Sequence, residues 1–313
     1  MKRMLCLFVV PVSVGLLTSC VSSKAEVVNN GVNMTVPVGT VQTDVRPRAS
    51  LSLAKGKYSK KDKYCEVSIE AEWPSGPDAV SAAIRRDLLV QMDTCLAYDY
   101  MDREIPLYKG DLSSPQVVVN HYGEHTYKLL LDMSRENHQA RVETEHDIAA
   151  ENGEKFQEPE VIPLVKDMEI KKDKETSKWC LFKMEYYWFT GGAHGVENTS
   201  YHTYDKATGR RFTDFIRTDA LNSMQPLLRA GLKEYFVRNG EKLSDKELDS
   251  YLLLEGKMIP LPSNSLYPSS KGLVFCYDSY EIAPYAAGQP SFTIQYDRIK
   301  PYMTAAAIEL LGL

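Results

Sequence analysis

The sequence predicts an α+β protein with two mixed α/β units, each a small, largely antiparallel sheet packed with helices. Apolar residues alternate between 65 and 73, which is the pattern of a half-buried strand. Between 221 and 235 they recur instead at helical spacing. Strand and helix patterns do not follow one another in a regular β-α-β order, and this favours the α+β class over a parallel α/β sheet.

Length and composition exclude several classes of protein. The chain has 313 residues, of which 43% are hydrophobic and 25% are charged, so it is neither a polytopic membrane protein nor a wholly disordered chain. The length favours two domains. The formal net charge of -5 gives no electrostatic basis for nucleic-acid binding, and we expect no nucleic-acid partner.

The first twenty residues predict export and lipidation. Lys2 and Arg3 precede an apolar run that is too short to span a bilayer. The run ends in Leu17-Thr18-Ser19-Cys20, which resembles the lipobox of bacterial lipoproteins. We therefore expect residues 1–19 to be a signal peptide and Cys20 to carry a lipid that anchors the chain in the bacterial cell envelope, facing the periplasm or the cell surface. The alternative is a soluble secreted protein.

The first unit is expected at 57–155, after a tether at 20–56. Its strand at 64–73 is followed by a helix that Asp78 can cap, and a second helix begins at Ser114-Pro115. Seven acidic residues lie between 143 and 160, against one lysine. Such a run is typical of a solvated connector, and we place the boundary between the units near residue 155.

The second unit, at 156–313, is rich in strand patterns. The sequence predicts strands at 179–189, 198–205, 273–277 and 291–296, a hairpin loop at 205–209, a helix opened by Thr218, a capping box at Ser244 to Glu247, and a terminal helix at 297–311 broken near Pro301.

Four cysteines remain once the signal and the lipid site are set aside: Cys65, Cys95, Cys180 and Cys276. In an oxidising compartment four cysteines allow three disulfide pairings. Because the first two lie in the first unit and the last two in the second, we favour pairing within each unit. The alternative is a set of buried free thiols.

One segment matches the pattern of a zinc hydrolase. His121, Glu124 and His125 satisfy the H-x-x-E-H pattern, in which two histidines on one helix face bind zinc and the glutamate activates water. The central Gly123 is unfavourable in a helix, and no third ligand is evident from the spacing. We therefore expect no cofactor and no catalytic residue, and we keep the zinc hydrolase as an alternative.

Two glycine-rich segments are the main candidates for a binding site. Each follows a strand pattern and mixes small residues with polar or aromatic ones, so that the backbone can turn sharply and approach another surface. The residues that could form a recognition surface are Gly191, Gly192, His194 and Gly195 in the first segment, and Tyr280, Glu281 and Tyr285 in the second. The alternative is that they serve the architecture of the fold.

These two segments, with the Tyr204-Asp205 to Thr208-Gly209 hairpin, resemble the extracytoplasmic domain of the RsiV and PdaC type. The resemblance covers about residues 57–305. It implies an envelope-facing binding or sensing domain without enzymatic activity, and the candidate partners are a lysozyme-like cationic protein or peptidoglycan. A purely structural envelope lipoprotein is the remaining alternative.

Overall fold

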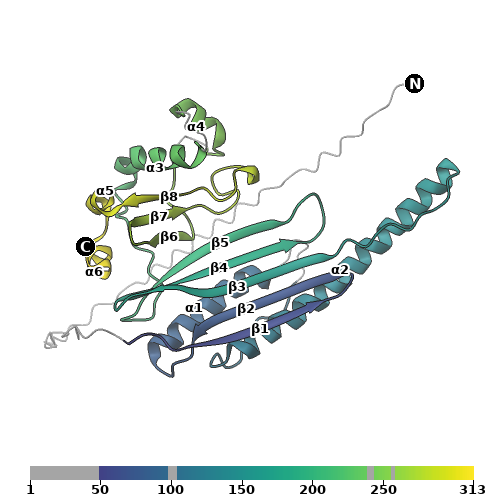
Figure 1. Cartoon of the computed structure of the whole chain (residues 1–313), viewed down its shortest axis with the longest axis horizontal. Helices are drawn as coiled ribbons and strands as arrows, with labels where there is room; N and C mark the ends of the chain where they lie inside the picture. The colour runs from purple at the N-terminus through teal and green to yellow at the C-terminus, as the bar shows by residue number, and fades with distance from the viewer. Residues whose placement is uncertain (1–48, 98–103, 238–242, 255–257) are drawn as a thin grey trace, which may run out of the picture. The chain divides into compact units, whose positions relative to one another are not determined.

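A computed structural model describes residues 49–97, 104–237, 243–254 and 258–313 (Figure 1). The predicted signal peptide, the lipidation site at Cys20 and most of the predicted tether lie outside the described residues. The described residues all belong to one compact unit. Within the described ranges no helix has the length and apolar character needed to cross a bilayer.

The first layer is a five-stranded sheet with the order β1-β2-β3-β4-β5. Its strands are β1 (Leu53–Lys61), β2 (Cys65–Pro74), β3 (Leu164–Glu175), β4 (Trp179–Phe189) and β5 (Val196–Asp205). Neighbouring strands are antiparallel except β2 and β3, which run parallel. Two helices, α1 (Ala79–Leu96) and α2 (Pro115–Asn152), form the crossover between these two strands and cover one face of the sheet (Figure 1).

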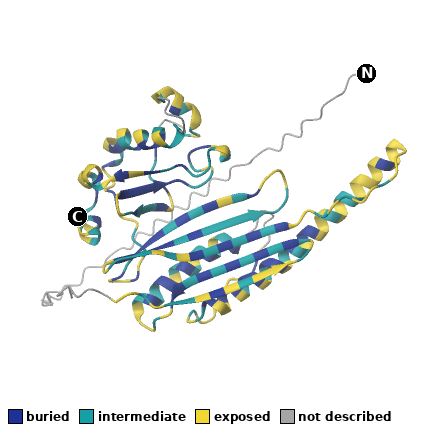
Figure 2. Ribbon diagram, in the orientation of Figure 1, coloured by how far each residue is buried: buried dark blue, intermediate teal, exposed yellow. Residues whose placement is uncertain are grey.

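The alternating pattern of β2 is confirmed. Cys65, Val67, Ile69, Ala71 and Trp73 are all buried, whereas the residues between them are partly exposed (Figure 2). The buried set packs with apolar residues of α1 and α2 into one core. The opposite face of the sheet is therefore the one left to polar residues.

The second layer is a three-stranded antiparallel sheet with the order β6-β7-β8. Its strands are β6 (Ser265–Pro268), β7 (Gly272–Cys276) and β8 (Ser291–Gln295), and the helices of this part are α3 (Leu221–Phe236), α4 (Asp245–Tyr251), α5 (Tyr296–Ile299) and α6 (Ala305–Leu311). These elements enclose a second core. The mixed architecture with two sheets confirms the predicted α+β class.

Several local predictions hold. Ser244 and Glu247 form a complete capping box at the start of α4. The terminal helix is interrupted at Pro301, where a short 3-10 turn separates α5 from α6. The acidic run behaves differently from the prediction, because α2 continues through it to Asn152 and ends at Gly153 in the left-handed conformation. The second half of α2 is largely exposed, as expected for so polar a sequence (Figure 2).

The two cores divide the chain at a different place from the predicted boundary near residue 155. The first core extends from Cys65 to Tyr204, and the second begins at Phe215. Residue 155 lies in the crossover between β2 and β3, which are adjacent strands of one sheet. Strand β1 begins at Leu53, within the segment that was predicted to be the tether.

Candidate functional site

The turn between β4 and β5 contains the first glycine-rich segment. Gly191 and Gly192 have φ angles of 103° and 96°, a region that residues with a side chain rarely adopt. A Cβ atom at either position would meet nothing within 4 Å, so the backbone conformation and not lack of space requires glycine. The two glycines therefore set the path of the turn and leave its surface open.

The structure brings His194 of this turn against Tyr285 of the second segment. The two rings stack with centroids 4.3 Å apart and an interplanar angle of 8°. Both side chains donate to the carbonyl of Gly195, His194 through Nδ1 at 2.9 Å and Tyr285 through its hydroxyl at 2.7 Å. Because a carbonyl only accepts, Nδ1 carries the proton and Nε2 of His194 is the basic nitrogen.

Tyr280 extends this aromatic group. Its ring lies 5.6 Å from that of Tyr285, and the residue is 53% exposed. It is the one residue other than glycine with a positive φ, 67°, in the described part of the chain. Strained backbone of this kind persists where the surroundings impose it, and it is concentrated at functional sites.

Glu281 has a different position from the one predicted for it. Its Oε1 accepts hydrogen bonds from the backbone N–H and the hydroxyl of Ser263, at 2.8 and 2.7 Å. Its Oε2 accepts from the backbone N–H of Asp278 at 2.7 Å. The carboxylate thus ties two loops together. His194 and Tyr285 converge, and Glu281 supports the loop that carries Tyr280 and Tyr285.

Residues outside the predicted set hold the second segment on the outer edge of β5. The side chain of Gln289 accepts from Thr199 N at 2.8 Å and donates to Thr199 O at 3.1 Å, which copies the pairing of a neighbouring strand. The hydroxyl of Ser279 donates to Glu197 O at 3.1 Å. The unpaired backbone groups of an edge strand need hydrogen-bond partners, but nothing in the sequence indicates which residues provide them.

A cavity of about 570 Å³ lies beside the glycine turn. Met133 and Asn137 of α2, Trp188 of β4, and Tyr280 contribute to its wall, together with the turn itself, including Gly191, Gly192 and His194. We call this cavity the turn cleft. Its size is within the range of small-molecule and glycan sites, and it combines aromatic faces with a few polar groups.

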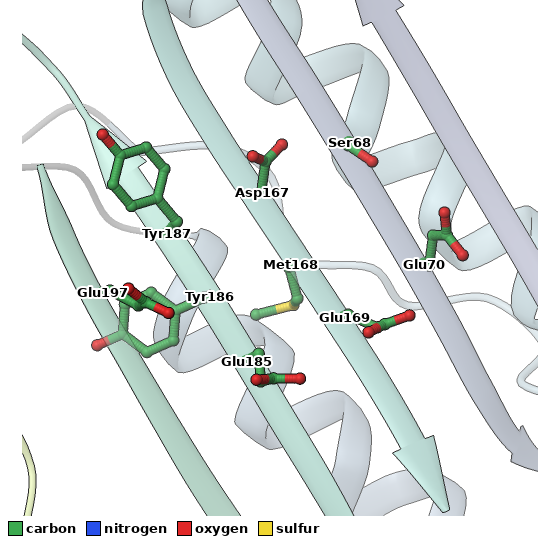
Figure 3. Close-up of a pocket in the computed structure, with 9 residues that line it drawn as sticks. All are labelled: Ser68, Glu70, Asp167, Met168, Glu169, Glu185, Tyr186, Tyr187 and Glu197. Carbon is green, nitrogen blue, oxygen red and sulfur yellow. The ribbon is translucent and has the colours of Figure 1, made fainter. Parts of the chain in front are cut away.

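The open face of the five-stranded sheet contains a second, smaller hollow of about 230 Å³ (Figure 3). We call it the acidic hollow, because its wall carries five carboxylates: Glu70, Asp167, Glu169, Glu185 and Glu197. Glu70, Glu169 and Glu185 are neighbours across three strands, and each forms an ion pair with a lysine. Burial, followed by the charge of Glu66, raises the pKa of Asp167 above its ordinary value.

The H-x-x-E-H segment lies on α2, where one ring nitrogen of each histidine bonds to the backbone. Nε2 of His121 donates to the carbonyl of Pro106 at 2.6 Å, and Nδ1 of His125 donates to that of His121 at 2.8 Å. No group of three or more potential ligands is arranged around a metal position within the ranges that the structure describes. Gly123 is explained by packing, because a Cβ there would lie 2.2 Å from the ring of Tyr58.

The predicted disulfides are not formed in the structure. Cys65, Cys95, Cys180 and Cys276 are all free thiols, and only Cys95 among them is partly exposed. Burial raises the pKa of Cys65, Cys95 and Cys276 to about 11 and that of Cys180 to about 12. The alternative of free, largely buried thiols therefore describes these residues in the structure.

Comparison with known proteins finds a family model that matches part of the second core. Residues 213–297 match the model for a protein of unknown function (DUF3298). A crystal structure of a DUF3298 family member from Bacteroides fragilis is similar with a TM-score of 0.60 and 17% identity, over 86% of this chain and 100% of that chain. A DUF3298 family protein from Pseudomonas aeruginosa is similar with a TM-score of 0.52 and 14% identity, over 83% and 97%. No curated protein matches the chain.

The similarity to the two DUF3298 structures extends well beyond the matched residues. Because it covers more than four fifths of this chain, it includes the five-stranded sheet as well as the second core. At these identities the similarity concerns the fold. The function of the chain has to be argued from its own residues.

Proposed function

We propose that the chain is a lipid-anchored protein of the bacterial cell envelope that binds a ligand and catalyses no reaction. The charged start, the short apolar run and the lipobox-like sequence ending in Cys20 support the anchor. The resemblance to RsiV-like and PdaC-like extracytoplasmic domains supports a binding or sensing role.

The turn cleft is the best supported binding site, and peptidoglycan is the favoured ligand. The observation that carries this assignment is the exposed Tyr280 at positive φ, which stacks with Tyr285 and thereby with His194 at the edge of the cleft. Flat aromatic surfaces bind the apolar faces of sugar rings, and the nearby Asn137 and Thr190 offer hydrogen-bonding groups for their hydroxyls.

The path of the chain into the body supports an orientation in which the turn cleft points away from the lipid anchor. Lys206 donates to Ala49 O at 2.9 Å, and Leu51 N donates to Glu175 at 2.8 Å. These contacts lie near the start of β4, whereas the glycine turn follows its end. With 11 residues in β4, the two points are about 35 Å apart. A body anchored through its N-terminal segment would thus present the turn cleft at the end remote from its attachment.

Retention of the purified protein by insoluble peptidoglycan tests this proposal. We expect Tyr280→Ala and His194→Ala to reduce the retained fraction at least about fivefold, since stacked aromatic groups contribute strongly to ring binding. Tyr251→Ala is the matched control, because Tyr251 is 49% exposed and lies on α4. Equal retention of all four proteins would refute the turn cleft as the site. If the parent chain is not retained, peptidoglycan is not its ligand.

A lysozyme-like cationic protein is a second candidate, and the acidic hollow favours it. The five carboxylates of its wall (Figure 3) outnumber the three lysines that pair with Glu70, Glu169 and Glu185, so a positively charged partner would be attracted to the hollow. We expect Asp167→Asn combined with Glu197→Gln to weaken capture on immobilised lysozyme at low salt. Glu143→Gln combined with Glu145→Gln on the exposed part of α2 is the control of equal charge change. Equal weakening by both pairs would indicate attraction by net charge alone.

Labelling with a radioactive fatty acid tests the anchor. We expect label in the parent chain and none in Cys20→Ser, because the thiol of Cys20 is the group expected to accept the diacylglyceryl lipid. An unlabelled parent chain would contradict lipidation and leave the binding proposal to be judged separately.

A further inference from the structure

A cavity of about 330 Å³ lies on the side of β4 and β5 that faces α1. We call it the inner cavity. Its wall includes Cys95 of α1, Met184 and Trp188 of β4, Ser200 of β5 and the loop residue Asp278. Trp188 also belongs to the wall of the turn cleft, and Asp278 lies two residues before Tyr280 of that cleft. The inner cavity and the turn cleft are therefore neighbours that meet at Trp188.

Two residues of this wall carry buried polar atoms for which the described part of the chain offers no hydrogen-bond partner. One is an acceptor, Oδ1 of Asp278, and the other is a donor, Nε1 of Trp188. Buried polar atoms in folded proteins are nearly always paired, and exceptions beside a cavity point to a water molecule or a ligand. A ligand that completes both residues needs a donor for Asp278 and an acceptor for Trp188.

The surroundings of Asp278 show what a donor would contribute there. The other oxygen of its carboxylate accepts from the amide of Asn264 at 2.7 Å. Burial raises the pKa of this carboxyl group, and the neighbouring amides of Asn264 and Asn198 oppose the rise. An N–H group of a ligand at Oδ1 would stabilise the ionised carboxylate in the same way as these amides do.

Ser200 offers a further donor to the inner cavity. It is 9% exposed, and its Oγ lies 3.0 Å from Nε2 of His202. Burial and then Arg211 lower the pKa of His202 to about 4, and Arg211 donates to Nδ1 of the neutral ring at 3.4 Å. The ring proton is therefore on Nε2, and Ser200 accepts it. Since Nε2 cannot also take a proton from Ser200, this pair is suited to binding a ligand oxygen and not to nucleophilic catalysis.

A secondary amide has the two groups that the unpaired atoms need. Its N–H donates and its carbonyl accepts, whereas an ammonium group only donates and a carboxylate only accepts. Because an amide is neutral, its fit does not depend on the charges around the inner cavity. The methyl group of an acetamide would meet Met184 and Cys95, whose sulfur atoms adapt well to small apolar groups.

We propose that the inner cavity binds the acetamido group of a 2-acetamido sugar, with its N–H at Asp278 and its carbonyl at the indole N–H of Trp188. This inference rests on the proposed function, because the sugar ring itself would lie on the side of the turn cleft. The turn cleft would then contact the face of the ring, and the inner cavity would contact the substituent on its second carbon. Together they would select N-acetylated glycans from glycans of the same backbone.

Calorimetric titration of the purified full chain with two matched tetrasaccharides tests this inference. Chitotetraose and cellotetraose have the same β-linked glucose backbone and differ only in the group on the second carbon of each ring, which is acetamido or hydroxyl. We expect chitotetraose to bind at least ~10-fold more tightly, as for the gain of one or two hydrogen bonds. At equal occupancy, chitotetraose and not cellotetraose should slow the alkylation of Cys95, located by peptide mass spectrometry.

Variants then assign the contacts through the ratio of the two affinities. Trp188→Phe and Asp278→Asn should each lower this ratio about tenfold. Trp179→Phe is the matched control for the first, since Trp179 also lies on β4 but outside the walls of both cavities. Asp167→Asn is the control for the second, since Asp167 is a half-buried carboxylate of the acidic hollow. Tyr280→Ala should weaken both tetrasaccharides and leave the ratio unchanged.

The outcomes separate this inference from the proposed function. Equal affinity for the two tetrasaccharides in a chain that peptidoglycan retains would overturn the inference alone. A preference for chitotetraose in a chain that peptidoglycan does not retain would refute that ligand and support the acetamido site. No binding of chitotetraose at about 10 mM, or an unchanged ratio in a folded Trp188→Phe variant, would also overturn the inference. If Asp278→Asn fails to fold, Trp188→Phe decides the outcome alone.

Discussion

Replacement of Tyr280 by glycine separates a recognition role from an architectural one. The left-handed conformation costs a residue with a side chain about 1–2 kcal/mol, and glycine removes this cost. Glycine in turn loses about 0.5–1 kcal/mol in backbone entropy, and the stacking with Tyr285 is worth about 0.5–1.5 kcal/mol. These contributions nearly cancel, so we expect the free energy of unfolding of Tyr280→Gly to stay within about 1 kcal/mol of the parent.

The assay is thermal unfolding measured beside peptidoglycan retention. For a chain of this size 1 kcal/mol corresponds to about 2–4 °C in Tm. We expect Tm to remain within that interval while retention falls. Removal of a large buried aromatic side chain costs about 3–5 kcal/mol instead. A loss of Tm on that scale, or unchanged retention, would refute the view that Tyr280 is held in a strained conformation for binding.

Three further predictions concern the framework. Gly123→Ala should destabilise the fold by about 1–3 kcal/mol in chemical denaturation, although alanine favours helices. Tyr58→Ala in the same chain should recover part of this loss, because it removes the ring that the new Cβ would meet. Glu281→Ala should cost about 1–3 kcal/mol and weaken ligand retention indirectly, and Glu281→Gln should cost less. Burial and then the charge of Arg211 lower the pKa of His202 to about 4 in the folded protein. As the pH falls from 6.5 to about 4, the unfolded chain therefore binds a proton that the folded protein does not bind, and the free energy of unfolding decreases. His202→Gln should flatten this part of the curve; an unchanged slope would contradict the assignment.

The sequence predicts those elements in which one face is clearly apolar or a terminal signal is explicit. The alternation through Cys65 to Trp73 and the capping box at Ser244 are of this kind, and both are confirmed. Strands β1 and β3 escape such analysis because their residues are rich in lysine and acids. On the open face of the sheet these charges pair across strands, as Lys57 does with Glu70. A segment whose sequence is largely polar can therefore form a strand in the folded protein.

The candidate site is predictable only in part for a similar reason. Glycines and aromatic residues identify both segments, and the contact between His194 and Tyr285 joins them. The function of Glu281 depends on Ser263 and on the Asp278 backbone, and nothing in the spacing of the sequence indicates those partners. Trp188 looks like an ordinary residue of a covered strand, and only the structure shows that it borders two cavities.

The division of the cores explains why the matched family region alone cannot define the binding site. Residues 213–297 cover most of the second core, and this range also contains Tyr280 and Tyr285. The rest of the wall of the turn cleft comes from α2, from Trp188 of β4 and from the turn between β4 and β5, which carries His194. Because residues from both parts of the chain form its wall, a change in α2 or in the glycine turn would alter the proposed binding site while the matched region stayed the same. Specificity within proteins of this fold should therefore follow the first core.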